Sequence, residues 1–153
     1  MKIFTVSREQ IVARPLAEVF EFFSHAGNLE MLTPAWLKFQ ILTPEPVAMR
    51  PGARIDYRIR YHGIPMRWVT EIEVWDPPHR FVDTQVRGPY KLWHHTHTFE
   101  ETKDGTRIGD VVRYAMPFGP LGRVVNFLQT QREVESIFDY RNRQIAKRFP
   151  AIP

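Results

Sequence analysis

Strand-like and helical periodicities follow one another along this chain in an order that restricts its fold. A strand-like start and a short helical stretch precede about 80 residues of strand pattern, and one long amphipathic helix then runs to the C-terminus. A curved antiparallel sheet with a single long helix across its concave side does not close into a solid core. We therefore expect an α+β domain with a pocket between the helix and the sheet.

Turn signals divide the strand-like region into short, consecutive strands. The hairpin sequence Lys103-Asp104-Gly105 lies between two alternating runs, and Gly63-Ile64-Pro65 and Asp76-Pro77-Pro78 separate earlier ones. Strands joined by such short connections have to be antiparallel. The predicted strands are 3–13, 36–42, 54–62, 66–75, 80–87, 92–102 and 106–116.

Helical spacing of apolar residues occurs on both sides of this region. Pro15 suits the first turn of a helix, which we expect to end at Gly27-Asn28 and to be followed by a short helix over 29–32. The region 121–149 contains no proline and, apart from Gly122, no glycine, and it predicts an amphipathic helix about 40 Å long. Its apolar positions recur at steps of three and four residues: Leu121, Val124, Val125, Leu128, Val134, Ile137, Phe138 and Ile145.

Length and composition predict a single globular domain over residues 1–153. The chain has 153 residues, of which 43% are hydrophobic and 25% charged, and this is enough to bury one core. No stretch is long enough to span a bilayer, and residues 1–9 have the pattern of a strand rather than a signal peptide. The absence of cysteine excludes disulfides and thiolate chemistry. These features predict a cytoplasmic protein without integral membrane association.

The positive charge of the chain is modest and dispersed. Its formal net charge is +4, and Arg54, Arg58 and Arg60 alternate with apolar residues, as on the solvated face of one strand. A nucleic-acid-binding domain of this kind would show clustered basic residues with interleaved aromatic ones. The sequence therefore predicts no nucleic-acid partner.

Several segments of the chain match a known family pattern. They are the strand-to-helix segment 13–20, the strand with Trp68 and Ile72 before 76–81, the segment 88–99, and the terminal helix behind 117–120. In these segments the chain resembles the SRPBCC superfamily, which includes START and Bet v1-like ligand binders and bacterial polyketide cyclases/dehydratases. The resemblance covers essentially the whole chain, and segment 88–99 is similar to a bacterial subgroup described as ligand-binding.

The resemblance implies a helix-grip fold, in which a seven-stranded antiparallel sheet grips the C-terminal helix around a cavity. It does not imply one activity, because carriers, receptors and enzymes share this scaffold. The matching positions are mainly structural, and no catalytic motif of the family is found among them.

Two adjacent strands place polar residues on the face expected to be interior. Trp93, His95, His97 and Phe99 share one face of their strand because side chains alternate. The matching face of the next strand carries Ile108, Asp110, Val112, Tyr114 and Met116. If Asp104-Gly105 forms a two-residue turn, His97 lies opposite Val112, His95 opposite Tyr114, and Phe99 opposite Asp110.

This register suggests that His95, His97, Asp110 and Tyr114 form a polar cluster in an apolar cavity. A carboxylate beside an imidazole fixes its tautomer and raises its basicity, as a general base or a polar anchor requires. The alternative is that each histidine is simply hydrogen-bonded in the sheet interior or lies at its rim. His95 and His97 could also bind zinc with Asp110, but this spacing is a weak signal without a fourth ligand, and we expect no metal and no cofactor.

The remaining cavity wall is predicted from strand faces and from the helix stripe. Val124 and Leu128 would form the roof of the cavity. In strand 80–87, either Asp83 and Gln85 face inward with Phe81, or Val82, Thr84 and Val86 do. The predicted ligand-binding residues are Tyr57, Trp68, Thr70, Phe81, Trp93, His95, His97, Phe99, Asp110, Val112, Tyr114, Val124 and Leu128.

These observations favour a cofactor-free module that binds a small hydrophobic or aromatic molecule of lipid, polyketide or isoprenoid type. One alternative is a cyclase/dehydratase enzyme that moves protons with His97, Asp110 and Tyr114. Another is an interaction module whose basic strand face docks an acidic partner or an anionic membrane surface. The oligomeric state is left open between monomer and homodimer, because an exposed sheet edge can pair with another copy.

Overall fold

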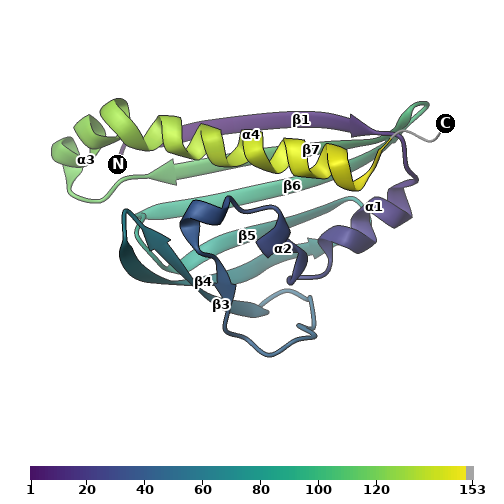
Figure 1. Ribbon diagram of the computed structural model, residues 1–153, viewed down its shortest axis with the longest axis horizontal. Coiled ribbons are helices and arrows are strands. Elements are labelled where there is room, and N and C mark those ends of the chain that lie inside the picture. Colours follow the sequence, from purple (N-terminus) through teal and green to yellow (C-terminus); the bar gives the residue numbers. More distant parts are fainter. Residues whose placement is uncertain (151–153) are drawn as a thin grey trace.

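A computed structural model, which describes residues 1–150, shows one seven-stranded antiparallel sheet with the helices on one side (Figure 1). The strand order is β1-β7-β6-β5-β4-β3-β2, so every neighbouring pair except β1 and β7 is consecutive in the sequence. This confirms the predicted helix-grip architecture. The strands are β1 (Phe4–Val12), β2 (Gln40–Ile41), β3 (Arg54–Tyr61), β4 (Ile64–Asp76), β5 (Arg80–Arg87), β6 (Leu92–Thr102) and β7 (Gly105–Ala115).

The second strand is much shorter than the sequence predicts. The expected strand 36–42 is replaced by a 3-10 turn η1 (Ala35–Leu37) and the two-residue strand β2. Between them Lys38 adopts a left-handed conformation with φ 49°, which interrupts extended backbone. The edge of the sheet at β3 is therefore only briefly covered.

Two short helices follow β1. Helix α1 (Leu16–Phe23) begins directly after Pro15, whose φ of −61° is already suited to a helix, and it buries Val19, Phe20, Phe22 and Phe23. Helix α2 (Asn28–Met31) has no buried residue. Of these two helices, only α1 therefore contributes large side chains to the core.

The β6–β7 hairpin has a different register from the one predicted. Thr102 pairs with Gly105, so the two turn residues are Lys103 and Asp104 instead of Asp104 and Gly105. Gly105 has φ +133°, and a Cβ atom there would lie 2.0 Å from the carbonyl oxygen of Val12. Glycine is thus required inside the ladder at this point, and the whole pairing shifts by two residues.

The shift by two residues leaves every side chain on its predicted face but changes its partners. His97 lies opposite Asp110, His95 opposite Val112, and Trp93 opposite Tyr114. Phe99 lies opposite Ile108 and not Asp110.

The C-terminal helix consists of α3 (Gly119–Val125), a π-helical turn η2 (Asn126–Thr130) and α4 (Gln131–Arg148). The wider π turn places residues four apart on one face, so Gly122, Asn126, Thr130 and Val134 are buried in succession. A Cβ atom on Gly122 would lie 1.9 Å from the carbonyl oxygen of Pro117, so glycine permits this close approach.

The first half of the helix is consequently rotated away from the orientation predicted for it. Val124 is 54% exposed and Leu128 66% exposed, so neither forms the expected roof of the cavity. Helical periodicity of 3.6 residues predicted an inward stripe through them, and the π turn breaks that periodicity.

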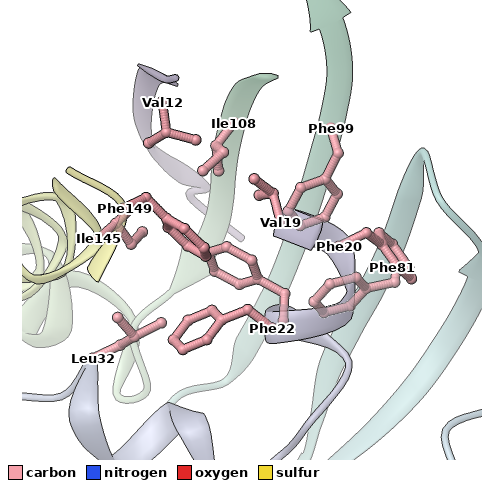
Figure 2. Packing of buried hydrophobic residues seen from close by; sticks show 11 residues of the cluster. Val12, Val19, Phe20, Phe22, Leu32, Phe81, Phe99, Ile108, Ile145 and Phe149 are labelled. Carbon is pink, nitrogen blue, oxygen red and sulfur yellow. The ribbon is translucent and has the colours of Figure 1, made fainter. Parts of the chain in front are cut away.

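Aromatic residues fill the space beneath α1 (Figure 2). Phe20 contacts Phe99 with ring centroids 5.1 Å apart, and Phe22 contacts Phe149 at 5.3 Å, both edge-on. This arrangement joins β6, α1 and the end of α4 in one hydrophobic cluster. The cluster closes this end of the space between sheet and helix.

Candidate functional site

Next to this cluster, a cavity of about 670 Å³ lies between the sheet and the helices. Residues of β3 to β6, α1, α2, η1 and the C-terminal helix line it. The wall over the sheet is aromatic: Trp68 lies 5.9 Å from Tyr57, 5.7 Å from Tyr90 and 5.3 Å from Trp93, measured between ring centroids. The sheet and the helix thus enclose a largely apolar space, as predicted.

The predicted site residues are divided among three places. Seven of them line the cavity: Tyr57, Trp68, Thr70, Phe81, Trp93, His95 and His97. Four others are buried and do not line it: Phe99, Asp110, Val112 and Tyr114. Val124 and Leu128 lie outside the cavity on the exposed side of the helix.

A cluster of five charged or titratable side chains lies at one side of the cavity. Asp83 on β5, His95 and His97 on β6, Asp110 on β7 and Arg141 on α4 form it, and it is called the polar cluster below. The strand register places Asp83 opposite His95 and His97 opposite Asp110. The polar cluster is therefore a consequence of three adjacent strands that present polar residues to the same face.

The hydrogen bonds in the polar cluster run along the diagonals between strands. His97 Nε2 lies 2.5 Å from Asp83 Oδ2, and His95 Nε2 lies 2.7 Å from Asp110 Oδ1. The two imidazole rings stack with centroids 3.6 Å apart. Arg141 Nη2 lies 3.3 Å from His97 Nδ1 and 3.6 Å from Asp110 Oδ1.

These contacts assign a proton to Nε2 of both histidines. A guanidinium can only donate, so His97 Nδ1 accepts from Arg141 and its proton lies on Nε2, which donates to Asp83. The ionised Asp110 can only accept, so His95 Nε2 carries the proton that is donated to it. His95 Nδ1 lies 3.7 Å from Asp83 Oδ2.

Burial and charge shift the pKa values within the polar cluster in opposite directions. Burial, together with the nearby His95 and Arg141, lowers the pKa of His97 to about 4, although Asp83 opposes this shift. Burial alone would raise the pKa of Asp110, but Arg141 and His95 outweigh it and hold this pKa well below its usual range. The pKa of Asp83 is lowered too, because the two histidines and Arg141 outweigh its burial. At neutral pH both carboxylates are ionised and His97 is neutral.

Tyr114 is not part of the polar cluster. Its hydroxyl donates to Asn126 Oδ1 at 2.6 Å, which fixes the π-helical turn against β7. Burial raises the pKa of Tyr114 to about 12. Its role in this structure is to hold the C-terminal helix on the sheet.

The polar cluster contains one group of side chains with metal-ligand chemistry. Asp83, His95 and His97 offer ligand atoms within 4.8 Å of one another, so Asp83 takes the place in which the sequence suggested Asp110. A cation there would have to displace the proton between His97 and Asp83. It would also lie close to the positive charge of Arg141, and both costs weigh against metal binding.

Asp83 and Arg141 are the cluster members that sequence reasoning left open or missed. Asp83 shares a face with Phe81, and the structure shows that this face of β5 is the inward one, with Gln85 hydrogen-bonded to Tyr90 O. Arg141 lies between Phe138 and Ile145 on the buried stripe of α4. An arginine at an apolar position of a helix was the signal that could have identified it.

A second polar group lies at the rim of the cavity. The hydroxyl of Tyr61 and the imidazole of His62 both contact the Glu133 carboxylate, the latter at 2.9 Å. Gln129 Nε2 lies 2.8 Å from His62 Nε2 and donates to Glu133 at 2.9 Å. These contacts join the β3–β4 hairpin to the C-terminal helix across the cavity rim.

The fold and the enclosed cavity define a helix-grip protein. A family model described as polyketide cyclase / dehydrase and lipid transport matches residues 12–136. The chain belongs to this family, which confirms the family resemblance of the sequence. None of the curated proteins matches the chain.

Solved structures support the same fold. Protein Ms6760 from Mycobacterium smegmatis is 20% identical, with a TM-score of 0.67 over 92% of this chain and 87% of that one. TTHA0849 from Thermus thermophilus is 23% identical, with a TM-score of 0.64 over 94% and 98%. Ara h 8.0201 is 13% identical, with a TM-score of 0.62 over 95% and 99%. At these identities the similarity shows the fold.

Within residues 1–150, no helix has both the length and the apolar character needed to cross a membrane.

Proposed function

We propose that this protein binds a small, largely apolar molecule in the cavity between its sheet and its C-terminal helix. The observation that carries the proposal is the cavity of about 670 Å³ with aromatic walls and a polar cluster at one side. Such a combination of apolar walls and few polar groups is typical of small-molecule sites. Lipid-like, polyketide-like and isoprenoid compounds fit this description.

Burial of apolar surface would supply most of the affinity. A ligand that buries about 250 Å² of apolar surface gains on the order of 6 kcal/mol before the costs of association. The aromatic residues Tyr57, Trp68 and Trp93 offer this surface, and Asp83, His95 and His97 orient the ligand.

The enzymatic alternative has one supporting observation, the hydrogen-bonded pair of His97 and Asp83 within reach of the cavity. However, burial and neighbouring charges lower the pKa of His97 to about 4, and so weak a base is poorly suited to proton transfer near neutral pH. Asp110 and Tyr114 do not line the cavity. The geometry therefore favours a carrier over a cyclase.

Filling the cavity tests the proposal. Thr70 is buried in the cavity wall, and Thr98 is exposed on β6. Fluorescence titration with the neutral compound N-phenyl-1-naphthylamine should show saturable binding to the wild type and to Thr98→Trp. Thr70→Trp should weaken binding at least about tenfold because the indole occupies ligand space. Unchanged binding to a folded Thr70→Trp variant would place the compound elsewhere and contradict the proposal.

A turnover assay distinguishes the enzymatic alternative from the proposed ligand-binding function. A carrier leaves a poly-β-keto substrate unchanged on incubation, whereas a cyclase would convert it. Conversion that is lost in a folded His97→Ala variant would establish the enzyme and overturn the preference for a carrier.

A further inference from the structure

We propose that the ligand carries a hydroxyl group on its apolar skeleton and that this hydroxyl binds the Asp83 carboxylate. The inference rests on the proposed function, because it assigns the polar end of a molecule held in the same cavity.

Asp83 is the most exposed of the polar-cluster members that line the cavity. Its side chain is 16% exposed, whereas those of His95, His97, Asp110 and Arg141 are between 3% and 6% exposed. One carboxylate oxygen, Oδ2, accepts from His97, and no group within residues 1–150 donates to Oδ1. The cavity therefore contains an ionised acceptor that lacks one donor.

The imidazole donors next to the two carboxylates are already engaged within the polar cluster. The Nε2 protons of His97 and His95 are donated to Asp83 and Asp110, and Arg141 Nη2 is directed at His97. Arg141 Nε has no hydrogen-bond partner in the part of the chain that the structure describes, but this atom is fully buried. A ligand group that binds the free acceptor of Asp83 has to bring a donor.

A hydroxyl also matches the second polar pair of the cavity wall. Tyr57 Oη and Thr70 Oγ1 lie 3.3 Å apart and share one hydrogen bond, so one of their two protons is left for another acceptor. A ligand hydroxyl can donate to Asp83 and accept this proton. An ammonium group can donate but cannot accept.

Charge acts in the same direction. Asp83 itself is ionised at neutral pH, because the histidines and Arg141 hold its pKa below the usual range. A ligand carboxylate would be placed next to Asp83 in a poorly solvated site, where like charges repel far more strongly than in water.

A matched set of compounds on one ring system tests this assignment. 2-Naphthol, 2-methoxynaphthalene and 2-naphthoate offer a donor, a capped oxygen and an anion, and each can be measured by displacement of N-phenyl-1-naphthylamine. In the wild type, 2-naphthol should bind about tenfold more tightly than 2-methoxynaphthalene, and 2-naphthoate should bind most weakly. In Asp83→Asn, the ratio of the affinities for 2-naphthol and 2-methoxynaphthalene should fall toward one. The affinity for 2-naphthoate should increase.

A matched control and the wild-type ranking keep the outcomes distinct. Glu73 lies exposed on β4, so Glu73→Gln removes one carboxylate outside the cavity and should retain the wild-type ranking. The inference is overturned, and the proposed function kept, if 2-methoxynaphthalene or 2-naphthoate binds the wild type as tightly as 2-naphthol does. If neither N-phenyl-1-naphthylamine nor any of the three compounds binds the wild type, the proposed function itself fails. The wild-type ranking decides the question even if Asp83→Asn does not fold.

Discussion

The space between the sheet and the C-terminal helix is filled beneath α1 and open beside the β3–β4 hairpin. Both regions are rich in aromatic residues. Beneath α1, the rings of Phe20, Phe22 and Phe23 enter the space and contact Phe99 or Phe149 from the sheet and the chain end. Beside the hairpin, Tyr57 and Trp68 contact other rings along the wall but leave the space between sheet and helix free.

The difference lies in what covers the sheet and not in the aromatic content of the sheet itself. Helix α1 buries four side chains, whereas α2 buries none, and η1 buries only Leu37. A cavity therefore persists where the covering elements are too short to fill it. The region beneath α1 is packed as a hydrophobic core.

The polar cluster lies on the boundary between the two regions. Phe81, which belongs to the packed cluster beneath α1, stacks on His97 with ring centroids 3.9 Å apart. Phe138 contacts His95 edge-on at 5.2 Å. The polar cluster is thus in contact with packed rings on one side, and its Asp83 faces the cavity on the other.

The largest expected effect comes from truncating a ring in the packed region. Phe99→Ala should lower the free energy of unfolding by about 3–5 kcal/mol, because it creates a new cavity among tightly packed rings. The matched change Phe39→Ala, in the wall of the existing cavity, should cost less than half as much, because one side of that ring already faces open space. Urea-induced unfolding measures both values. Equal losses would show that the two regions do not differ in packing.

The polar cluster should make the free energy of unfolding depend on pH. The pKa of His97 is about 4 in the folded protein, so between pH 4 and its ordinary value near 6.5 only the unfolded chain takes up this proton. Stability should therefore fall by roughly 3 kcal/mol as the pH is lowered through this range. Protonation of Asp83 and Asp110, whose pKa values are also lowered, adds a further loss at lower pH.

Urea unfolding at several pH values checks this prediction. His97→Gln should remove most of the slope between pH 6.5 and pH 4, because the amide does not titrate. His25 is exposed and lies outside the polar cluster, so His25→Gln should retain the wild-type slope. A flat wild-type profile would show that His97 is not held neutral by its surroundings.

The smallest effect on stability is expected at the cavity rim. Glu133→Ala removes the acceptor shared by Tyr61, His62 and Gln129, and it should change the free energy of unfolding by less than about 1 kcal/mol. Release of N-phenyl-1-naphthylamine should nevertheless become several-fold faster in stopped-flow experiments, because the hairpin loses two of its contacts with the helix. Glu135→Ala, on the same helix but outside the lining, serves as the control. Equal release rates in both variants would mean that the ligand leaves by another route.

The sequence by itself determined the elements and their order. Prolines and glycines at 63–65, 76–78 and 103–105 separate the strands, and strict alternation assigns His95 and His97 to one face. These features are local, because a turn or a pleat depends on residues close together in the chain. The sheet, the long helix and the enclosed space between them followed from this information.

Only the tertiary structure decided which residues meet. A hairpin register shifted by two residues keeps the same faces, so alternation could not show that His97 lies opposite Asp110. The inward face of α3 was fixed by Gly122 against Pro117 and by Asn126 on Tyr114, contacts between segments that local periodicity does not contain. Asp83 and Arg141 likewise contact the histidines only because separate strands and a helix come together on folding.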